Sequence, residues 1–148
     1  MPKNKGLGAG RLPDEGFRGT AVSARSIVGV RVLVVDDDDG VRETVRDYLV
    51  DCGADVVSVR SADAAISMIT ERPPDVLISD VTMPGHDGFW LIRAVRALER
   101  GGDVPAIAIT GRLDRAEALL AAGFTEVRGK PPDMAELAGL VAGLAARC

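Results

Sequence analysis

The 148-residue sequence has few aromatic side chains, only two cysteines and no long apolar run. Because 3% of the residues are aromatic, aliphatic side chains and alanine must fill the core. Cys52 and Cys148 show neither the spacing of a metal site nor a disulfide framework. No stretch reaches the roughly 18 apolar residues of a membrane span, and no apolar region follows the basic start as in a signal peptide. We therefore expect a cytoplasmic protein that does not contact a membrane.

Charge is unevenly distributed along the chain. The formal net charge is −4, but residues 1–29 contain five basic and two acidic residues, so residues 30–148 carry −7. Residues 1–29 are rich in glycine and polar residues without sustained apolar periodicity, which predicts a flexible basic N-terminal tail. Residues 30–148 have the length and composition of one globular domain. The acidic charge of this domain argues against nucleic-acid binding by it.

From Val30 onward, five short apolar segments alternate with five segments of helical periodicity. The predicted strands are residues 31–35, 55–59, 75–79, 105–109 and 125–128. The predicted helices are residues 39–52, 62–71, 89–99, 113–122 and 133–146. This alternation predicts an α/β fold, a doubly wound five-stranded parallel sheet with helices on both faces.

Carboxylates follow two of the apolar strands. The first strand is followed by Asp36 and Asp37, and the third by Asp80. The carboxyl ends of parallel strands meet at one edge of a sheet, so these side chains are expected to form a compact acidic pocket. Like charges at short range repel strongly in a partly dry site, so the pocket needs a cation or bound protons. The next two acids, Asp38 and Asp39, are interpreted as the cap and first turn of the following helix.

Two hydrogen-bond donors follow the remaining strands at the same edge. Thr110 comes after the fourth strand and Lys130 after the fifth. Three carboxylates provide the hard oxygen ligands that Mg²⁺ prefers, while a hydroxyl and an ammonium suit the oxygens of a phosphoryl group. The set is therefore suited to accepting a phosphoryl group on an aspartate.

With these residues in view, the sequence resembles the receiver domain of two-component response regulators over about residues 30–144. The motifs that carry the resemblance are Val34–Asp38 (VVDDD), Ser79–Gly85 (SDVTMPG) with Asp87-Gly88, Ile109–Gly111 (ITG) and Gly129–Pro131 (GKP). Each motif is short, but their order and spacing are specific. The resemblance implies a flavodoxin-like, CheY-like fold with strand order 2-1-3-4-5.

The resemblance also implies roles for the acidic residues. Asp80 matches the residue that accepts the phosphoryl group. Asp37 and Asp80 match direct Mg²⁺ ligands, joined by the backbone carbonyl of Thr82, while Asp36 assists mainly through water. Mg²⁺ is the expected cofactor.

Further roles follow from the same resemblance. Lys130 would pair with Asp80 and then with the phosphoryl oxygens, and the Lys130–Pro131 bond is expected to be cis. Thr110 would be the switch hydroxyl. The family's usual aromatic switch position is occupied by Val127, so aromatic rotation coupled to Thr110 is not available. The segment between Thr110 and Lys130 is shorter than is common, which predicts a short or displaced helix there.

The implied function is that of a phosphoryl-accepting signalling module. A histidine kinase or a histidine phosphotransfer protein would donate the phosphoryl group from phosphohistidine to Asp80, and a surface switch would then address a downstream effector protein. The chain would catalyse only its own phosphorylation and dephosphorylation, so it is not expected to be an enzyme in the usual sense. A homodimer remains open, as does a place within a hybrid histidine kinase or phosphorelay.

Two other functions are weighed against this one. An Mg²⁺-dependent phosphohydrolase with an aspartyl-phosphate intermediate usually needs a second Asp two residues after the nucleophile, where Thr82 stands. A pseudo-receiver scaffold would never take a phosphoryl group. Of the remaining candidates, His86 is interpreted as loop surface and Trp90 as a partly exposed packing residue near the pocket.

Overall fold

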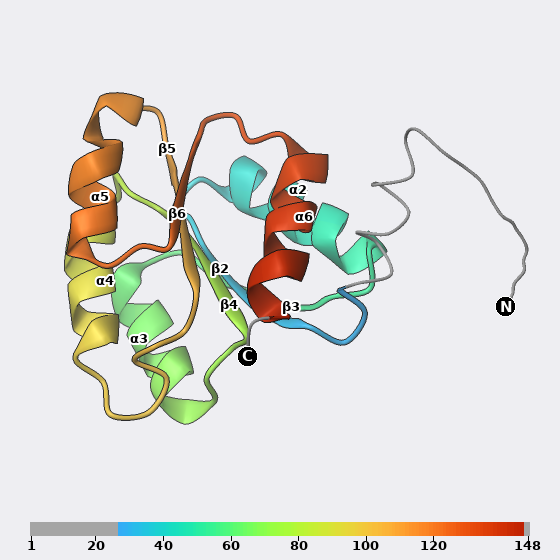
Figure 1. Ribbon diagram of the computed structural model, residues 1–148, viewed down its shortest axis with the longest axis horizontal. Helices are drawn as coiled ribbons and strands as arrows, with labels where there is room; N and C mark the ends of the chain where they lie inside the picture. Colours follow the sequence, from blue (N-terminus) through green and yellow to red (C-terminus); the bar gives the residue numbers. More distant parts are fainter. Residues whose placement is uncertain (1–26, 147–148) are drawn as a thin grey trace, which may run out of the picture.

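The computed structural model describes residues 27–146, which form a five-stranded parallel sheet between two layers of helices (Figure 1). The elements are β2 (Arg31–Val35), α2 (Asp39–Asp51), β3 (Asp55–Val59), α3 (Ala62–Glu71), β4 (Val76–Asp80), α4 (Gly88–Arg96), β5 (Ala106–Thr110), the 3₁₀ turn η1 (Leu113–Arg115), α5 (Ala116–Ala122), β6 (Glu126–Gly129) and α6 (Met134–Ala145). The α/β class and the doubly wound parallel sheet predicted from the sequence are confirmed.

The sheet has the strand order β3-β2-β4-β5-β6, and every pair of neighbouring strands is parallel. In order of appearance this is 2-1-3-4-5, as the resemblance implied. The residues of β4 and β5 are buried from end to end. Helices cover both faces of these central strands, which explains why their sequences are continuous apolar runs instead of alternating ones.

Two hydrophobic cores lie on opposite faces of the sheet. One core joins the sheet to α3, α4 and α5, and its fully buried side chains include Ile69 and Leu91. The other joins the sheet to α2 and α6, with Leu49 and Val141 fully buried. In Figure 1, α3, α4 and α5 stand on one side of the strands and α2 and α6 on the other. This sandwich fixes the strands, so the loops at their carboxyl ends project from a rigid base.

Acidic or hydroxyl side chains cap the starts of α2, α3, α4 and α6. The side chain of Asp38 accepts a hydrogen bond from the amide of Val41 at the start of α2, which confirms its predicted capping role. Asp87 does the same for Trp90 at the start of α4. At the other end of α2, Gly53 has a φ of 102°, a conformation that favours glycine.

Several element boundaries differ from the predicted ones. The last three strands end one residue later than predicted, at Asp80, Thr110 and Gly129, because these residues still pair with the neighbouring strands. The helix predicted over residues 113–122 consists of the 3₁₀ turn η1 followed by α5, which has seven residues. The prediction of a short helix in this region is thus confirmed.

The packed domain begins before Val30. The side chain of Ile27 is fully buried among α2 and α6 residues, and its carbonyl accepts a hydrogen bond from the amide of Val30. Residues 27–29 were expected to belong to the tail, but an apolar side chain so close to the first strand can still reach the core. The rest of the predicted tail, residues 1–26, lies outside the described residues.

Among the helices of residues 27–146, none combines the length and the hydropathy that crossing a membrane would require.

Gly88 brings the start of α4 against the end of β4. A Cβ atom at Gly88 would lie 2.8 Å from the Cα atom of Val81 and 2.9 Å from the carbonyl oxygen of Asp80, both of them backbone atoms. The amide of Gly88 also donates to the carbonyl of Val81 at 2.7 Å. Only glycine permits this approach directly behind Asp80.

We predict that Gly88→Ala lowers the free energy of unfolding by about 1–3 kcal/mol, because backbone must move to make room. Urea denaturation followed by circular dichroism would measure the change. Gly143→Ala in α6 is the matched control, because a Cβ there meets nothing within 4 Å. That control should gain about 0.5–1 kcal/mol from the better helix propensity of alanine. Equal effects of the two substitutions would contradict the close approach.

Candidate functional site

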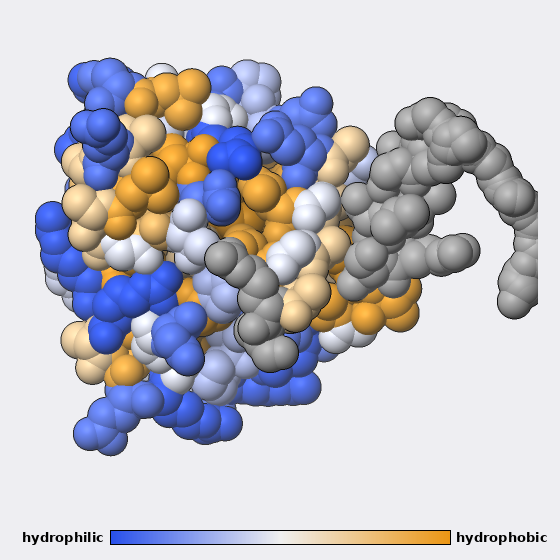
Figure 2. Space-filling model, in the orientation of Figure 1, coloured by the Kyte–Doolittle hydropathy of each residue, from blue (hydrophilic) through white to orange (hydrophobic). Residues whose placement is uncertain are grey.

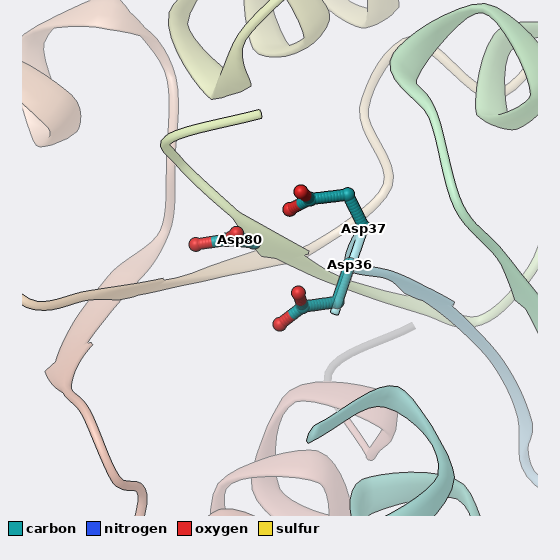
Figure 3. A group of neighbouring side chains, drawn as sticks. All are labelled: Asp36, Asp37 and Asp80. Atoms are coloured by element: carbon teal, nitrogen blue, oxygen red, sulfur yellow. The ribbon is translucent and has the colours of Figure 1, made fainter. Parts of the chain in front are cut away.

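Three carboxylates gather at the carboxyl edge of the sheet (Figure 3). Asp36 and Asp37 follow β2, and Asp80 is the last residue of β4. One ligand atom from each of the three lies within 4.8 Å of the others. Asp36 and Asp80 are each only 4% exposed. The predicted acidic pocket is therefore present, and two of its members are nearly inaccessible to water.

Sheet register explains why these acids meet. β2 and β4 are neighbours with Val35 opposite Ser79, so the next residue of each strand, Asp36 and Asp80, lies at the same level. The Asp36 carboxylate accepts a hydrogen bond from the amide of Asp38 at 2.9 Å. The Asp80 carboxylate accepts one from the amide of Val81 at 2.8 Å. Local backbone donors thus fix the orientation of both carboxylates.

Arg42 holds the loop that carries the first two acids. Its guanidinium donates to the carbonyl oxygen of Asp36 at 2.9 Å and also binds the carboxylate of Asp39. Asp39 in turn pairs with Arg60, which follows β3. This role of Arg42 was not predicted from the sequence. The available signal was an arginine one helical turn after the acidic run, where its side chain points back toward the helix start.

Lys130 supplies the positive charge of the site. Its Nζ atom lies 2.9 Å from Oδ1 of Asp80 and 3.7 Å from Oδ2 of Asp36. The Lys130–Pro131 bond is cis, which confirms the prediction. Burial of the ammonium opposes its charge, but the hydrogen bond and charge of Asp80 outweigh this effect and raise the pKa of Lys130 above its usual value.

The charge of the pocket is not balanced by Lys130 alone. Burial, together with the charges of Asp80 and Asp37, raises the pKa of Asp36, while the Asp38 amide and Lys130 lower it less. Three carboxylates facing one ammonium leave excess negative charge at short range. Hard carboxylate oxygens are the donors that Mg²⁺ prefers, so the donor set and its charge fit this ion. Asp36, Asp37 and Asp80 are the side chains that would hold it.

Thr110 ends β5, next to the carboxylates. Asp80 lies opposite Ile109 in the sheet, so Thr110 extends one residue beyond it at the same edge. Its side chain is 2% exposed, and its Oγ1 accepts a hydrogen bond from the amide of Arg112 at 2.9 Å. The amide of Lys130 donates to the Thr110 carbonyl at 3.0 Å, which ties the switch candidate to the lysine.

The turn after β4 carries Thr82, whose side chain is exposed and whose carbonyl remains a predicted metal ligand. Further along this turn, the ring of His86 stacks on that of Trp90, with centroids 3.7 Å apart and 6° between the planes. Nδ1 of His86 also lies 2.9 Å from a carboxylate oxygen of Asp63 on α3. His86 is exposed as predicted, but its two contacts attach the turn to α3 and α4, which no sequence signal indicated.

The raised pKa of Asp36 has a consequence for stability. The folded protein binds this proton more tightly than the unfolded chain does. The free energy of unfolding therefore falls as pH rises from the usual aspartate pKa through the raised one. We predict that Asp36→Asn stabilises the metal-free protein at pH 7 by on the order of 1 kcal/mol, because it removes a buried like charge. Thermal unfolding in EDTA would measure this.

Asp38→Asn is the matched control, since asparagine is an equally good helix cap and Asp38 lies outside the cluster. Its stability should stay close to that of the unsubstituted protein. Added Mg²⁺ should stabilise the unsubstituted protein more than Asp36→Asn. A lower unfolding temperature for Asp36→Asn in EDTA would show that charge repulsion is not the dominant effect at Asp36.

Comparisons with known proteins agree with this geometry. The family model of the response regulator receiver domain matches residues 32–142. A 14.6 kDa protein in the sodA1 3′ region of Leptolyngbya boryana is 41% identical over 119 residues, which cover 79% of this chain and 91% of that protein. The response regulator protein FleR of Pseudomonas aeruginosa is 35% identical over 117 residues, covering 78% of this chain but only 24% of FleR.

A solved structure adds a metal to the comparison. The receiver domain of the sensor histidine kinase PA1611 from Pseudomonas aeruginosa, with a magnesium ion coordinated in its active site cleft, is 26% identical. It superposes with a TM-score of 0.75 over 80% of this chain and 99% of that domain. The family match spans most of the chain and ends beyond Lys130, so it includes the whole acidic site. The chain therefore belongs to the response regulator receiver domain family.

Proposed function

We propose that this chain accepts a phosphoryl group on Asp80 from a phosphohistidine of a histidine kinase or a histidine phosphotransfer protein. The observation that carries the proposal is the ammonium of Lys130, 2.9 Å from the Asp80 carboxylate within a cluster of three acids. A cation on one side and a candidate divalent-ion site on the other make Asp80 the carboxylate best prepared to bond with an anionic phosphoryl group.

The transfer is a displacement at phosphorus. An oxygen of the Asp80 carboxylate attacks in line and forms the new P–O bond, while the P–N bond to the donor imidazole breaks and its electron pair returns to the imidazole. When bound, Mg²⁺ supplies charge neutralisation for the phosphoryl oxygens. Lys130 moves its hydrogen bond from the carboxylate to a phosphoryl oxygen. Hydrolysis of the acyl phosphate later restores Asp80, so the chain catalyses only its own modification and reset.

The added charge at Asp80 would drive the signal. Attraction of the Thr110 hydroxyl to a phosphoryl oxygen favours a second surface conformation, which an effector protein distinguishes from the first. The named relatives include both a response regulator and a sensor histidine kinase. The chain could thus act in an ordinary response regulator, or as the receiver of a hybrid kinase or phosphorelay. A homodimer and a cytoplasmic location remain predictions.

A pseudo-receiver scaffold is the second candidate. Its support is Val127 at the usual aromatic position and the short helical region between Thr110 and Lys130. The complete set of Asp36, Asp37, Asp80, Thr110 and Lys130 favours phosphorylation. An unused carboxylate cluster with two buried members would cost stability without compensation.

We predict that incubation with Mg²⁺ and acetyl phosphate adds the mass of one phosphoryl group to the intact protein, and that Asp80→Asn abolishes this gain. Intact-mass spectrometry of the two proteins measures it directly. Asp63→Asn is the matched control, because Asp63 is an exposed aspartate on α3 that pairs with His86 and lies outside the carboxylate cluster.

The mass gain should also disappear in EDTA and weaken with Lys130→Met, which removes the charge but keeps the length of the side chain. A protein that gains no mass under any of these conditions would support the scaffold instead. If the mass gain persists in Asp80→Asn but is lost in a variant of another aspartate, that other aspartate is the residue that accepts the phosphoryl group.

A further inference from the structure

The usual aromatic switch position offers no movable ring in this chain. Val127 lies in β6 and packs, partly buried, against the core that contains α4 and α5. A β-branched side chain held on a strand has little rotamer freedom. If phosphorylation changes the surface next to β6, another residue must provide the change.

Leu113 is placed to do so. A Cβ atom built on Gly129 would meet three atoms of the Leu113 side chain, Cδ1 at 3.2 Å, Cγ at 3.5 Å and Cδ2 at 3.8 Å. The end of the leucine therefore rests on the last residue of β6. Gly129 is two residues from Val127, and alternate strand residues share a face, so Leu113 covers the same face as the missing aromatic ring.

This contact is weakly held. The Leu113 side chain is 58% exposed although it touches the strand. It belongs to η1, a single 3₁₀ turn without a side-chain cap. Gly111, two residues before Leu113, lies in open space where a Cβ atom would meet nothing within 4 Å. A short turn behind an unhindered glycine can shift at little cost.

The turn is connected directly to the switch hydroxyl. Oγ1 of Thr110 accepts the amide hydrogen of Arg112 at 2.9 Å, and the Arg112 carbonyl accepts the amide hydrogen of Arg115 at 3.0 Å. Leu113 follows Arg112 in the chain. If Thr110 moves toward a phosphoryl group on Asp80, the Arg112 amide either follows the hydroxyl or loses its acceptor. In the first case the turn that holds Leu113 shifts with the hydroxyl, and in the second it loses a hydrogen bond that fixes its position.

We infer that Leu113 is the switch residue of this chain: it covers Gly129 at rest and leaves it when Thr110 is drawn toward the phosphorylated Asp80. This rests on the proposed function and identifies how its signal reaches the surface. Figure 2 shows hydrophobic surface between α5 and α6 on the face that includes β6. Movement of Leu113 changes the shape of the exposed apolar surface on that face. The charged residues on either side of Leu113, Arg112 and Asp114, already form an ion pair with each other, so Leu113 is the apolar side chain of this turn.

Thermodynamic linkage couples phosphoryl binding to the Leu113–Gly129 contact, so a change in either one must affect the other. If phosphoryl binding displaces Leu113, then weakening the Leu113 contact must favour phosphoryl binding. We predict that Leu113→Ala raises the affinity for beryllium fluoride at saturating Mg²⁺ by about fivefold, the low end of coupling between sites. The matched control is Leu120→Ala, which truncates a leucine of α5 that is 46% exposed and should leave the affinity unchanged.

A spectroscopic test observes the side chain itself. In protein with ¹³C-labelled leucine methyl groups, nuclear Overhauser effects should join Leu113 to the α protons of Gly129. Saturation with Mg²⁺ and beryllium fluoride should abolish these effects and shift the Leu113 methyl signals, while the Leu120 methyl signals stay in place. The Thr110→Val variant is measured at the Mg²⁺ and beryllium fluoride concentrations that saturate that variant. Its Leu113 signals should not respond, because the hydroxyl that moves the turn is absent.

The outcomes separate this inference from the proposed function. If the amide of Val81, which hydrogen-bonds to Asp80, shifts with beryllium fluoride while the Leu113–Gly129 effects persist, the site works and the inference is overturned. The same conclusion follows if Leu113 responds equally in Thr110→Val, or if Leu113→Ala and Leu120→Ala change affinity alike. If no signal near Asp80 responds at all, the proposed function fails and the inference fails with it.

Discussion

The repulsion among three carboxylates at one edge of a parallel sheet is the constraint on which this molecule depends. Asp36 and Asp80 are almost completely buried, and within residues 27–146 Lys130 is the cation that pairs with them. Such a cluster is unfavourable for folding by itself, since burial and neighbouring like charges cost free energy and raise the pKa of Asp36. The same imbalance makes the site receptive to a divalent cation and to transfer chemistry. Under the proposed function, this local loss of stability is the cost of a site that binds Mg²⁺ and accepts a phosphoryl group.

The rest of the fold keeps this unfavourable arrangement rigid. Two cores clamp the sheet from both faces, and Gly88 lets α4 begin directly behind Asp80. Arg42 holds the loop of the first acids from the side of α2, while His86 attaches the turn after β4 to its neighbours. The less constrained element at this edge is η1, which lies between Thr110 and α5. Rigidity around the carboxylates and freedom at η1 would let a change at Asp80 move one turn without disturbing the sheet.

Sequence reasoning reached the fold and the acidic pocket for a physical reason. Buried parallel strands require continuous apolar runs, and the carboxyl ends of such strands meet, so Asp36, Asp37 and Asp80 could be placed together without coordinates. The contacts of Arg42 with the Asp36 carbonyl and of Leu113 with Gly129 could not be placed, since they depend on side-chain direction and on the path of short turns. The ends of β4 and β5 were also placed one residue too early, because the polar side chains of Asp80 and Thr110 were taken to lie beyond strands whose backbone pairing includes them.

The central claim is that one divalent cation resolves the repulsion at this edge of the sheet. Replacement of Mg²⁺ by paramagnetic Mn²⁺ tests it directly, because amide signals close to the ion broaden. Backbone NMR during a Mn²⁺ titration should first broaden the amides of Asp36, Asp37, Val81 and Lys130, and excess Mg²⁺ should restore them. Broadening that begins elsewhere, for instance along the exposed acids of α2, or that Mg²⁺ fails to reverse, would contradict the claim.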